Sequence, residues 1–106
     1  MKKHNQRLIE LIANNVTIES RHIQLFEEIA ELTQAICKLK RLNNQDETLA
    51  KELNAKLLQN NYIEELADVN IVVQELIYMA GEERVEAEMN HKLKRTIERM
   101  KLDKTR

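Results

Sequence analysis

Phe26–Leu32, with the sequence FEEIAEL, places three carboxylates inside an otherwise apolar helical pattern. A second segment, EELADV at Glu64–Val69, has the same character. In each segment two acids stand three residues apart, so both lie on one helix face about one turn apart. Two such helices facing each other would gather their carboxylates at one point, where like charges repel and lose hydration unless a cation joins them. The two segments therefore predict a pair of packed helices with a candidate metal site at their contact.

The composition predicts one all-helical domain. The chain has 106 residues, which is enough for a single domain over residues 1–106 and too few for two. It contains no proline and one glycine, Gly81, so it has almost no strong turn signals. Charged residues make up 33% and hydrophobic residues 42%, a mixture typical of amphipathic helices. We therefore expect the all-α class.

The charge balance and the cysteine content restrict the partners and the compartment. The formal net charge is -1, which offers no bulk attraction for nucleic acid. The single cysteine, Cys37, allows no internal disulfide and fits a reducing compartment. No apolar run approaches membrane-spanning length, and the first residues lead into amphipathic sequence rather than a signal-peptide core. We expect a cytoplasmic protein that binds neither nucleic acid nor membrane.

Apolar periodicity and polar breaks divide the chain into helices. Four main helices are expected at residues 5–13, 18–42, 62–80 and 82–102, with a short additional helix at 47–58. A polar turn at 43–46 and the pair Asn60-Asn61 separate the middle helices. Thr17 can cap the second main helix, and Gly81 can end the third. The expected architecture is a four-helix bundle.

The expected core stripes leave much apolar surface to be covered. The stripe of 18–42 consists of Leu25, Ile29, Leu32, Ile36 and Leu39. The stripe of 62–80 consists of Leu66, Val69, Val73, Ile77 and Ala80. Cys37 is expected as inert core beside the first stripe, and Asn70 as a satisfied buried amide or a contact between subunits on the second. Because 62–80 is apolar almost all round, one small unit cannot cover it, and we expect a homodimer or homotetramer.

Four acids are the candidate metal ligands: Glu28, Glu31, Glu65 and Asp68. They lie beside the core stripes rather than opposite them, although glutamate pairs at this spacing are usually a solvated helix face. The last helix offers a cationic edge formed by Lys92, Arg95 and Arg99 at three- and four-residue spacing. Salt bridges to neighbouring acids are the ordinary interpretation of that edge. Acids for a hard divalent cation together with bases for phosphate are the composition of a nucleoside triphosphate site.

These motifs resemble the EExxE…ExxD signature of the MazG-like, all-α nucleoside triphosphate pyrophosphohydrolases. EEIAELTQAICK at 27–38 and EELADV at 64–69 carry the acidic part of the resemblance. NHKLKR at 90–95 resembles the family's basic segment on its last helix, where an Asn-x-Lys-aromatic pattern precedes Arg. The chain departs from the family in two places. A long spacer of 33 residues separates Glu31 from Glu65, and Leu93 stands where an aromatic residue is common.

The resemblance implies magnesium-dependent hydrolysis between the α- and β-phosphates, with manganese as an alternative ion, giving nucleoside monophosphate and pyrophosphate. The substrate base stays open, as does a house-cleaning role on damaged nucleotides. By resemblance, the metal ligands are Glu28, Glu31, Glu65 and Asp68. Glu27 would lie in the outer shell or help orient water, which makes Glu27 and Glu28 the catalytic candidates. Lys38, Lys92 and Arg95 would face phosphate oxygens, where cations stabilise the leaving pyrophosphate.

Two other interpretations remain open. In the first, the protein is a non-catalytic helical interaction module whose acids are surface charge and whose apolar third helix is a groove for a partner. In the second, the Glu-x-x-His pairs Glu19/His22 and Glu88/His91 belong to a di-iron four-helix bundle. Exposed histidines are the ordinary interpretation of both pairs. Release of pyrophosphate from a nucleotide would distinguish the enzyme from the module, and retained iron would indicate the di-iron protein.

Overall fold

The computed structural model describes residues 2–42 and 49–102, and these residues form four helices and no strand. The helices are α1 (Lys3–Ala13), α2 (Ile18–Leu42), α3 (Leu49–Ala80) and α4 (Glu82–Arg99). The all-α class is therefore confirmed, and the bounds of α2 agree with the prediction. The turn predicted at 43–46 lies outside the described residues.

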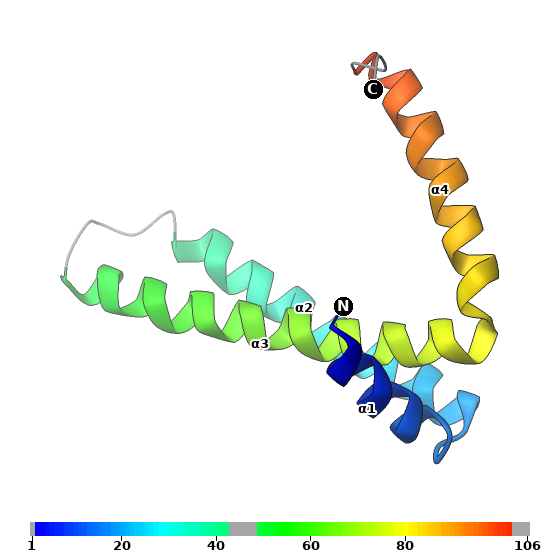
Figure 1. Ribbon diagram of the computed structural model, residues 1–106. Coiled ribbons are helices and arrows are strands. Elements are labelled where there is room, and N and C mark those ends of the chain that lie inside the picture. The colour runs from blue at the N-terminus through cyan, green and yellow to red at the C-terminus, as the bar shows by residue number, and fades with distance from the viewer. Residues whose placement is uncertain (1, 43–48, 103–106) are drawn as a thin grey trace.

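The helices are arranged around α3, which is the longest (Figure 1). α2 lies antiparallel along α3, and α1 packs against α3 on its way into α2. α4 leaves the end of α3 and projects away from the other helices (Figure 1). Within the described chain the backbone of α4 approaches only α3, and no residue of α4 is buried. Residues 2–42 and 49–102 of one copy therefore do not close a four-helix bundle by themselves.

Local chemistry explains where α2 and α3 meet their neighbours. Oγ1 of Thr17 accepts a hydrogen bond from the backbone N–H of Ser20 at 3.1 Å, as expected of a residue that caps α2. Gly81 separates α3 from α4 with a φ of 115°, a backbone angle that residues other than glycine rarely adopt. Its N–H donates to the carbonyl oxygen of Ile77 at 2.9 Å, which completes the last turn of α3. This turn sets the direction in which α4 departs.

The predicted break at Asn60-Asn61 was wrong, because both residues lie inside the continuous helix α3. Asparagine in a helix interior costs only a fraction of a kcal/mol relative to alanine, about 0.7 kcal/mol at most. Packing of α3 along α2 outweighs such a local cost. The separate helix predicted at 47–58 is therefore the first part of α3, and the last helix ends at Arg99 rather than at residue 102.

The buried face of the α2–α3 contact agrees with the predicted stripes only in part, since Leu25, Leu32 and Leu39 are half-buried. Ala35, Leu42 and Val72 are buried, whereas Ile29 and Ile36 are exposed. α2 contacts only α3 in the part of the chain that the structure describes, so only the side of α2 that faces α3 is covered. Cys37 and Asn70, both expected in or near the core, are exposed as well, and Asn70 lies beside Leu8 at the rim of the contact between α1 and α3.

The remaining apolar surface is large. Buried apolar residues in the described chain are few: Ile9, Ala13, Ala35, Leu42 and Val72. Exposed large apolar side chains occur on every helix, among them Phe26 at 70% and Leu57 at 68% exposure. None of the described helices is long and apolar enough to cross a membrane.

Candidate metal centre

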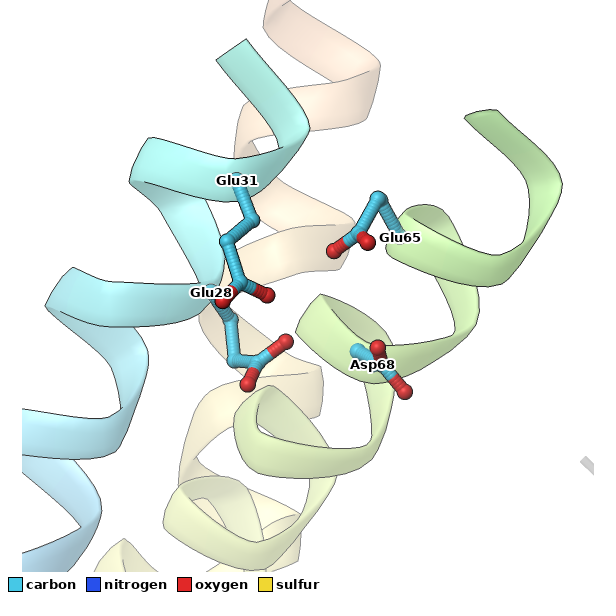
Figure 2. Close-up of side chains that lie close together, drawn as sticks. All are labelled: Glu28, Glu31, Glu65 and Asp68. Atoms are coloured by element: carbon cyan, nitrogen blue, oxygen red, sulfur yellow. The ribbon is translucent and has the colours of Figure 1, made fainter. Parts of the chain in front are cut away.

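α2 and α3 bring together the four acids that the sequence pattern singled out: Glu28, Glu31, Glu65 and Asp68. One carboxylate oxygen from each residue lies within 4.8 Å of the others, and we call this group the acidic cluster. Figure 2 shows that two acids come from each helix, that Glu28, Glu31 and Glu65 extend toward the space between the helices, and that Asp68 lies beside them on α3. The pair of acids on α2 and the pair on α3 are more than thirty positions apart in the chain.

The antiparallel packing of α2 on α3 explains this meeting. On each helix the two acids stand three residues apart, so they occupy adjacent turns of one face. Running in opposite directions, the helices set Glu31 opposite Glu65 and Glu28 near Asp68 (Figure 2). Glu28 and Glu65 are therefore half-buried at the contact between the helices, whereas Glu31 and Asp68 lie at its exposed edge.

The polar atoms of the cluster are incompletely satisfied. Oε1 of Glu28 accepts a hydrogen bond from Nε2 of Gln24 at 2.6 Å. In contrast, Oε2 of Glu28 and Oε2 of Glu65 are buried and have no hydrogen-bond partner. Buried polar atoms in proteins nearly always have a partner, so two orphaned oxygens in one cluster point to a group that binds there.

The electrostatics of the cluster are those of crowded like charges. Burial raises the pKa of the Glu65 carboxyl above its ordinary value, and the negative charges of Glu31 and Asp68 raise it further. A hydrogen bond with Glu31 and the charge of Glu28 act in the same direction. A cation between these carboxylates would relieve the same repulsion.

The geometry and the donor set fit a hard divalent cation. Magnesium binds oxygen at about 2.0–2.1 Å, so two of its ligands lie roughly 3 Å apart when adjacent and roughly 4 Å apart when opposite. The 4.8 Å spread of the acidic cluster is close to that requirement, and small side-chain rotations can supply the difference. The cluster contains only carboxylate oxygens, which magnesium and manganese prefer over softer ligands.

Other residues predicted for the site lie outside the acidic cluster. Glu27 is exposed and turned away from it, as its place one residue before Glu28 requires. Lys38 is exposed on α2, seven residues or about 10 Å of helix beyond Glu31. Lys92 and Arg95 are exposed on α4, which has no backbone contact with α2 in the described chain. Neither residue forms an ion pair with the cluster within that part of the chain.

The sequence interpretation missed one feature of the same helix contact. Nη1 of Arg21 on α2 lies 3.4 Å from Oε2 of Glu75 on α3, and Glu75 is only 1% exposed. A signal existed, since Glu75 interrupts an apolar run seven residues after Asp68, and Arg21 stands seven residues before Glu28. Seven residues are two helical turns, so each belongs to the face that carries the cluster.

The di-iron interpretation gains no support. His22 and His91 are exposed, and the group of described residues that could hold a metal contains carboxylates alone. No protein-family model, curated protein or solved structure matches this chain. The resemblance of its motifs to a known family therefore rests on the sequence motifs alone.

Proposed function

We propose that this chain is a MazG-like, magnesium-dependent nucleoside triphosphate pyrophosphohydrolase. One observation carries the proposal: the ExxE motif of α2 and the ExxD motif of α3 meet in a single acidic cluster with two buried, unpartnered oxygens. Carboxylates of glutamates that only make a helix surface polar would not converge on one point, and water would hydrate their oxygens. Four carboxylates within 4.8 Å in a helix contact cost stability unless a cation offsets their repulsion.

The residues of the cluster would hold the ion and, through it, the substrate. When bound, a divalent cation neutralises phosphate charge and lowers the pKa of a coordinated water. Glu28 and Glu65 supply the buried oxygens, and Gln24 fixes the Glu28 carboxylate by its hydrogen bond. Glu27 is exposed and turned away from the cluster, so the proposal gives it an outer-shell role in orienting water and not a ligand role.

A second copy of the chain would complete the site. Lys92 and Arg95 are suited to phosphate oxygens, yet α4 carries them away from the cluster of its own chain (Figure 1). The same helix exposes an apolar stripe that includes Met89 at 47% and Leu93 at 59% exposure. A helix with no buried residue gains little from forming alone, so a partner surface should cover that stripe. In a homodimer or homotetramer, α4 of one copy would bring its cations to the acidic cluster of another.

A helical interaction module is the second candidate. The observation in its favour is the amount of exposed apolar surface on α1, α2 and α4, which suits docking of another protein. The module offers no account of the orphaned carboxylate oxygens, because a docking surface does not require crowded charge inside a helix contact. We therefore prefer the hydrolase.

A panel of nucleotides tests the choice. Purified protein is incubated with magnesium and with canonical and modified nucleoside triphosphates, then with manganese, and pyrophosphate and monophosphate are measured. We expect release of both products from at least one nucleotide, and loss of release in Glu65→Gln. Glu64→Gln is the matched control, since Glu64 is exposed and lies outside the cluster. Folded protein that releases no pyrophosphate from any nucleotide would favour the interaction module.

A further inference from the structure

The Arg21–Glu75 ion pair is a second polar feature of the α2–α3 contact, and the proposed reaction does not use it. Glu75 is the largest fully buried side chain among the described residues, and Arg21 is 18% exposed. Arg21 also donates from Nε to Oγ of Ser20 at 3.3 Å. A buried ion pair often adds little net stability compared with apolar residues of similar size. Its best-attested use is to select one arrangement of helices over others.

The ion pair and the acidic cluster require the same register of α2 against α3. Seven residues from Arg21 to Glu28 on α2 are matched by seven from Asp68 to Glu75 on α3. Three residues between the two acids of α2 are matched by three between the two acids of α3. In antiparallel helices equal spacings keep every pair opposite, so the ion pair and both halves of the cluster meet in the same register. The ion pair lies roughly 10 Å along the helices from the cluster.

Apolar packing alone would hold this register weakly. The buried apolar residues of the contact, Ala35, Leu42 and Val72, make contacts without direction, and α3 is apolar around most of its circumference. A slip of one turn moves the helices by about 5.4 Å and still sets apolar residues against apolar ones. Repulsion within the metal-free cluster favours such a slip, because it would separate the carboxylates beyond their 4.8 Å spacing.

A slipped arrangement would, however, leave Glu75 buried without its cation. Arg21 would then lie a full turn away from the carboxylate it faces at 3.4 Å. An uncompensated buried charge opposes that slip more strongly than any apolar contact does. We propose that the Arg21–Glu75 ion pair is a register lock, which holds α2 and α3 in the alignment where Glu28 and Glu31 meet Glu65 and Asp68. The function of the lock for metal binding rests on the proposed function, whereas the register itself does not.

Two matched double variants test the lock. In Arg21→Met/Glu75→Met the pair is replaced by apolar side chains, so the helices can stay folded while the register is freed. In Arg21→Glu/Glu75→Arg the charges are exchanged and the lock is restored. Arg21→Lys keeps the positive charge, and one nitrogen is sufficient because the contact with Glu75 uses only Nη1 of Arg21. This variant replaces the charge-exchanged variant as the control if the latter does not fold. Circular dichroism establishes that each variant is helical.

The first measurement is the affinity for magnesium alone, by titration calorimetry on the full chain. We expect binding to weaken about 10- to 100-fold in the Met/Met variant, as for loss of a group that orients ligands, and to stay within about threefold of wild type in the exchanged or Lys variant. Wild-type affinity in a helical Met/Met variant would overturn the proposal. So would weak binding in a folded variant that keeps both charges.

The second measurement reports the register without metal. Spin labels are placed on exposed positions, Gln34 on α2 and Lys56 on α3, after Cys37→Ser, and distance distributions are recorded with excess unlabelled protein. We expect one distance in wild type and a second population shifted by several ångströms in the Met/Met variant. A single unchanged distance there would overturn the lock. If wild type keeps one distance that the Met/Met variant loses, but binds no magnesium, the proposed function fails and the lock stands.

Discussion

Glu28→Gln should make the metal-free protein more stable and remove most of its response to magnesium. The substitution keeps the shape of the side chain and deletes one negative charge from the acidic cluster. At 4.8 Å, each like-charged neighbour repels by about 0.9 kcal/mol even in a water-like dielectric. Against Glu31 and Asp68 alone this gives about 1.7 kcal/mol, and salt screens it little because the distance is shorter than a Debye length of about 8 Å.

One contact acts in the opposite direction. Gln24 donates to Glu28 at 2.6 Å, and a neutral acceptor makes that hydrogen bond weaker by about 1 kcal/mol. The net gain is therefore about 0.7 kcal/mol, which corresponds to a melting temperature higher by about 3–6 °C for a domain of this size. A residue with a purely structural role would lower the melting temperature when substituted.

Magnesium should separate wild type from the variant still further. At a concentration of about 100 times its dissociation constant, a ligand stabilises the folded state by about 2.7 kcal/mol, or about 10–20 °C here. If loss of one ligand weakens binding about 100-fold, the same concentration gives only about 0.4 kcal/mol, or about 2–3 °C.

The assay is differential scanning calorimetry at one protein concentration, with EDTA or magnesium. Glu64→Gln is the control and should behave as wild type, since Glu64 is exposed and outside the cluster. A lower melting temperature of metal-free Glu28→Gln, or a full magnesium shift in that variant, would refute the assignment of Glu28.

Three further predictions concern pH, phosphate and assembly. Because the folded-state pKa of Glu65 is raised above 4.5, proton binding to this carboxylate stabilises the metal-free folded state. This stabilisation is fully present below pH 4.5 and is lost as the pH rises through the raised pKa. Protons compete with magnesium for the same oxygens, so the magnesium-induced shift in melting temperature should shrink as pH falls from 8 to 5; an unchanged shift would contradict the raised pKa. Lys92→Ala should raise KM for the triphosphate about 10-fold, which corresponds to about 1.4 kcal/mol of binding free energy, and should leave the magnesium-induced shift in melting temperature unchanged. If α4 of one copy acts at the cluster of another, mixing the Lys92→Ala and Glu28→Gln variants should restore activity. No recovery would indicate that α4 acts at the site of its own chain. Leu93→Asp should lower the mass of the proposed oligomer in light scattering, because it puts a charge on the apolar stripe of α4. An unchanged mass would remove that stripe from the proposed interface.

The acidic motifs were the most predictable part of the site. ExxE and ExxD have the spacing of adjacent helical turns, so each pair had to share a face once its segment was helical. Their presence on two helices joined by a connection made a meeting plausible, and the cluster forms where the pattern indicated. The burial of the acidic side chains was not predictable, because the periodicity of apolar residues identifies the apolar side of α2 and does not identify the side that α3 covers. Ile29 and Ile36 are exposed for that reason, while Ala35 is buried.

The breaks and the last helix show the opposite limit. Asn60-Asn61 carried a local preference against helix that tertiary packing of α3 on α2 overrode. The direction of α4 depends on the backbone of Gly81, whose φ of 115° the sequence permits but does not require. For the same reason the distance of Lys92 and Arg95 from the acidic cluster could not be read from their spacing.

The sequence by itself therefore determined the helical class, the faces on which the acids lie and the single hinge-like glycine, because these follow from local spacing and backbone chemistry. Only the tertiary structure decided which faces meet, that Glu28 and Glu65 keep buried oxygens without partners, and that Arg21 faces Glu75. Those facts depend on the register of α2 against α3. Register is a property of two helices together, and apolar periodicity, which is almost unchanged by a slip of one turn, does not encode it.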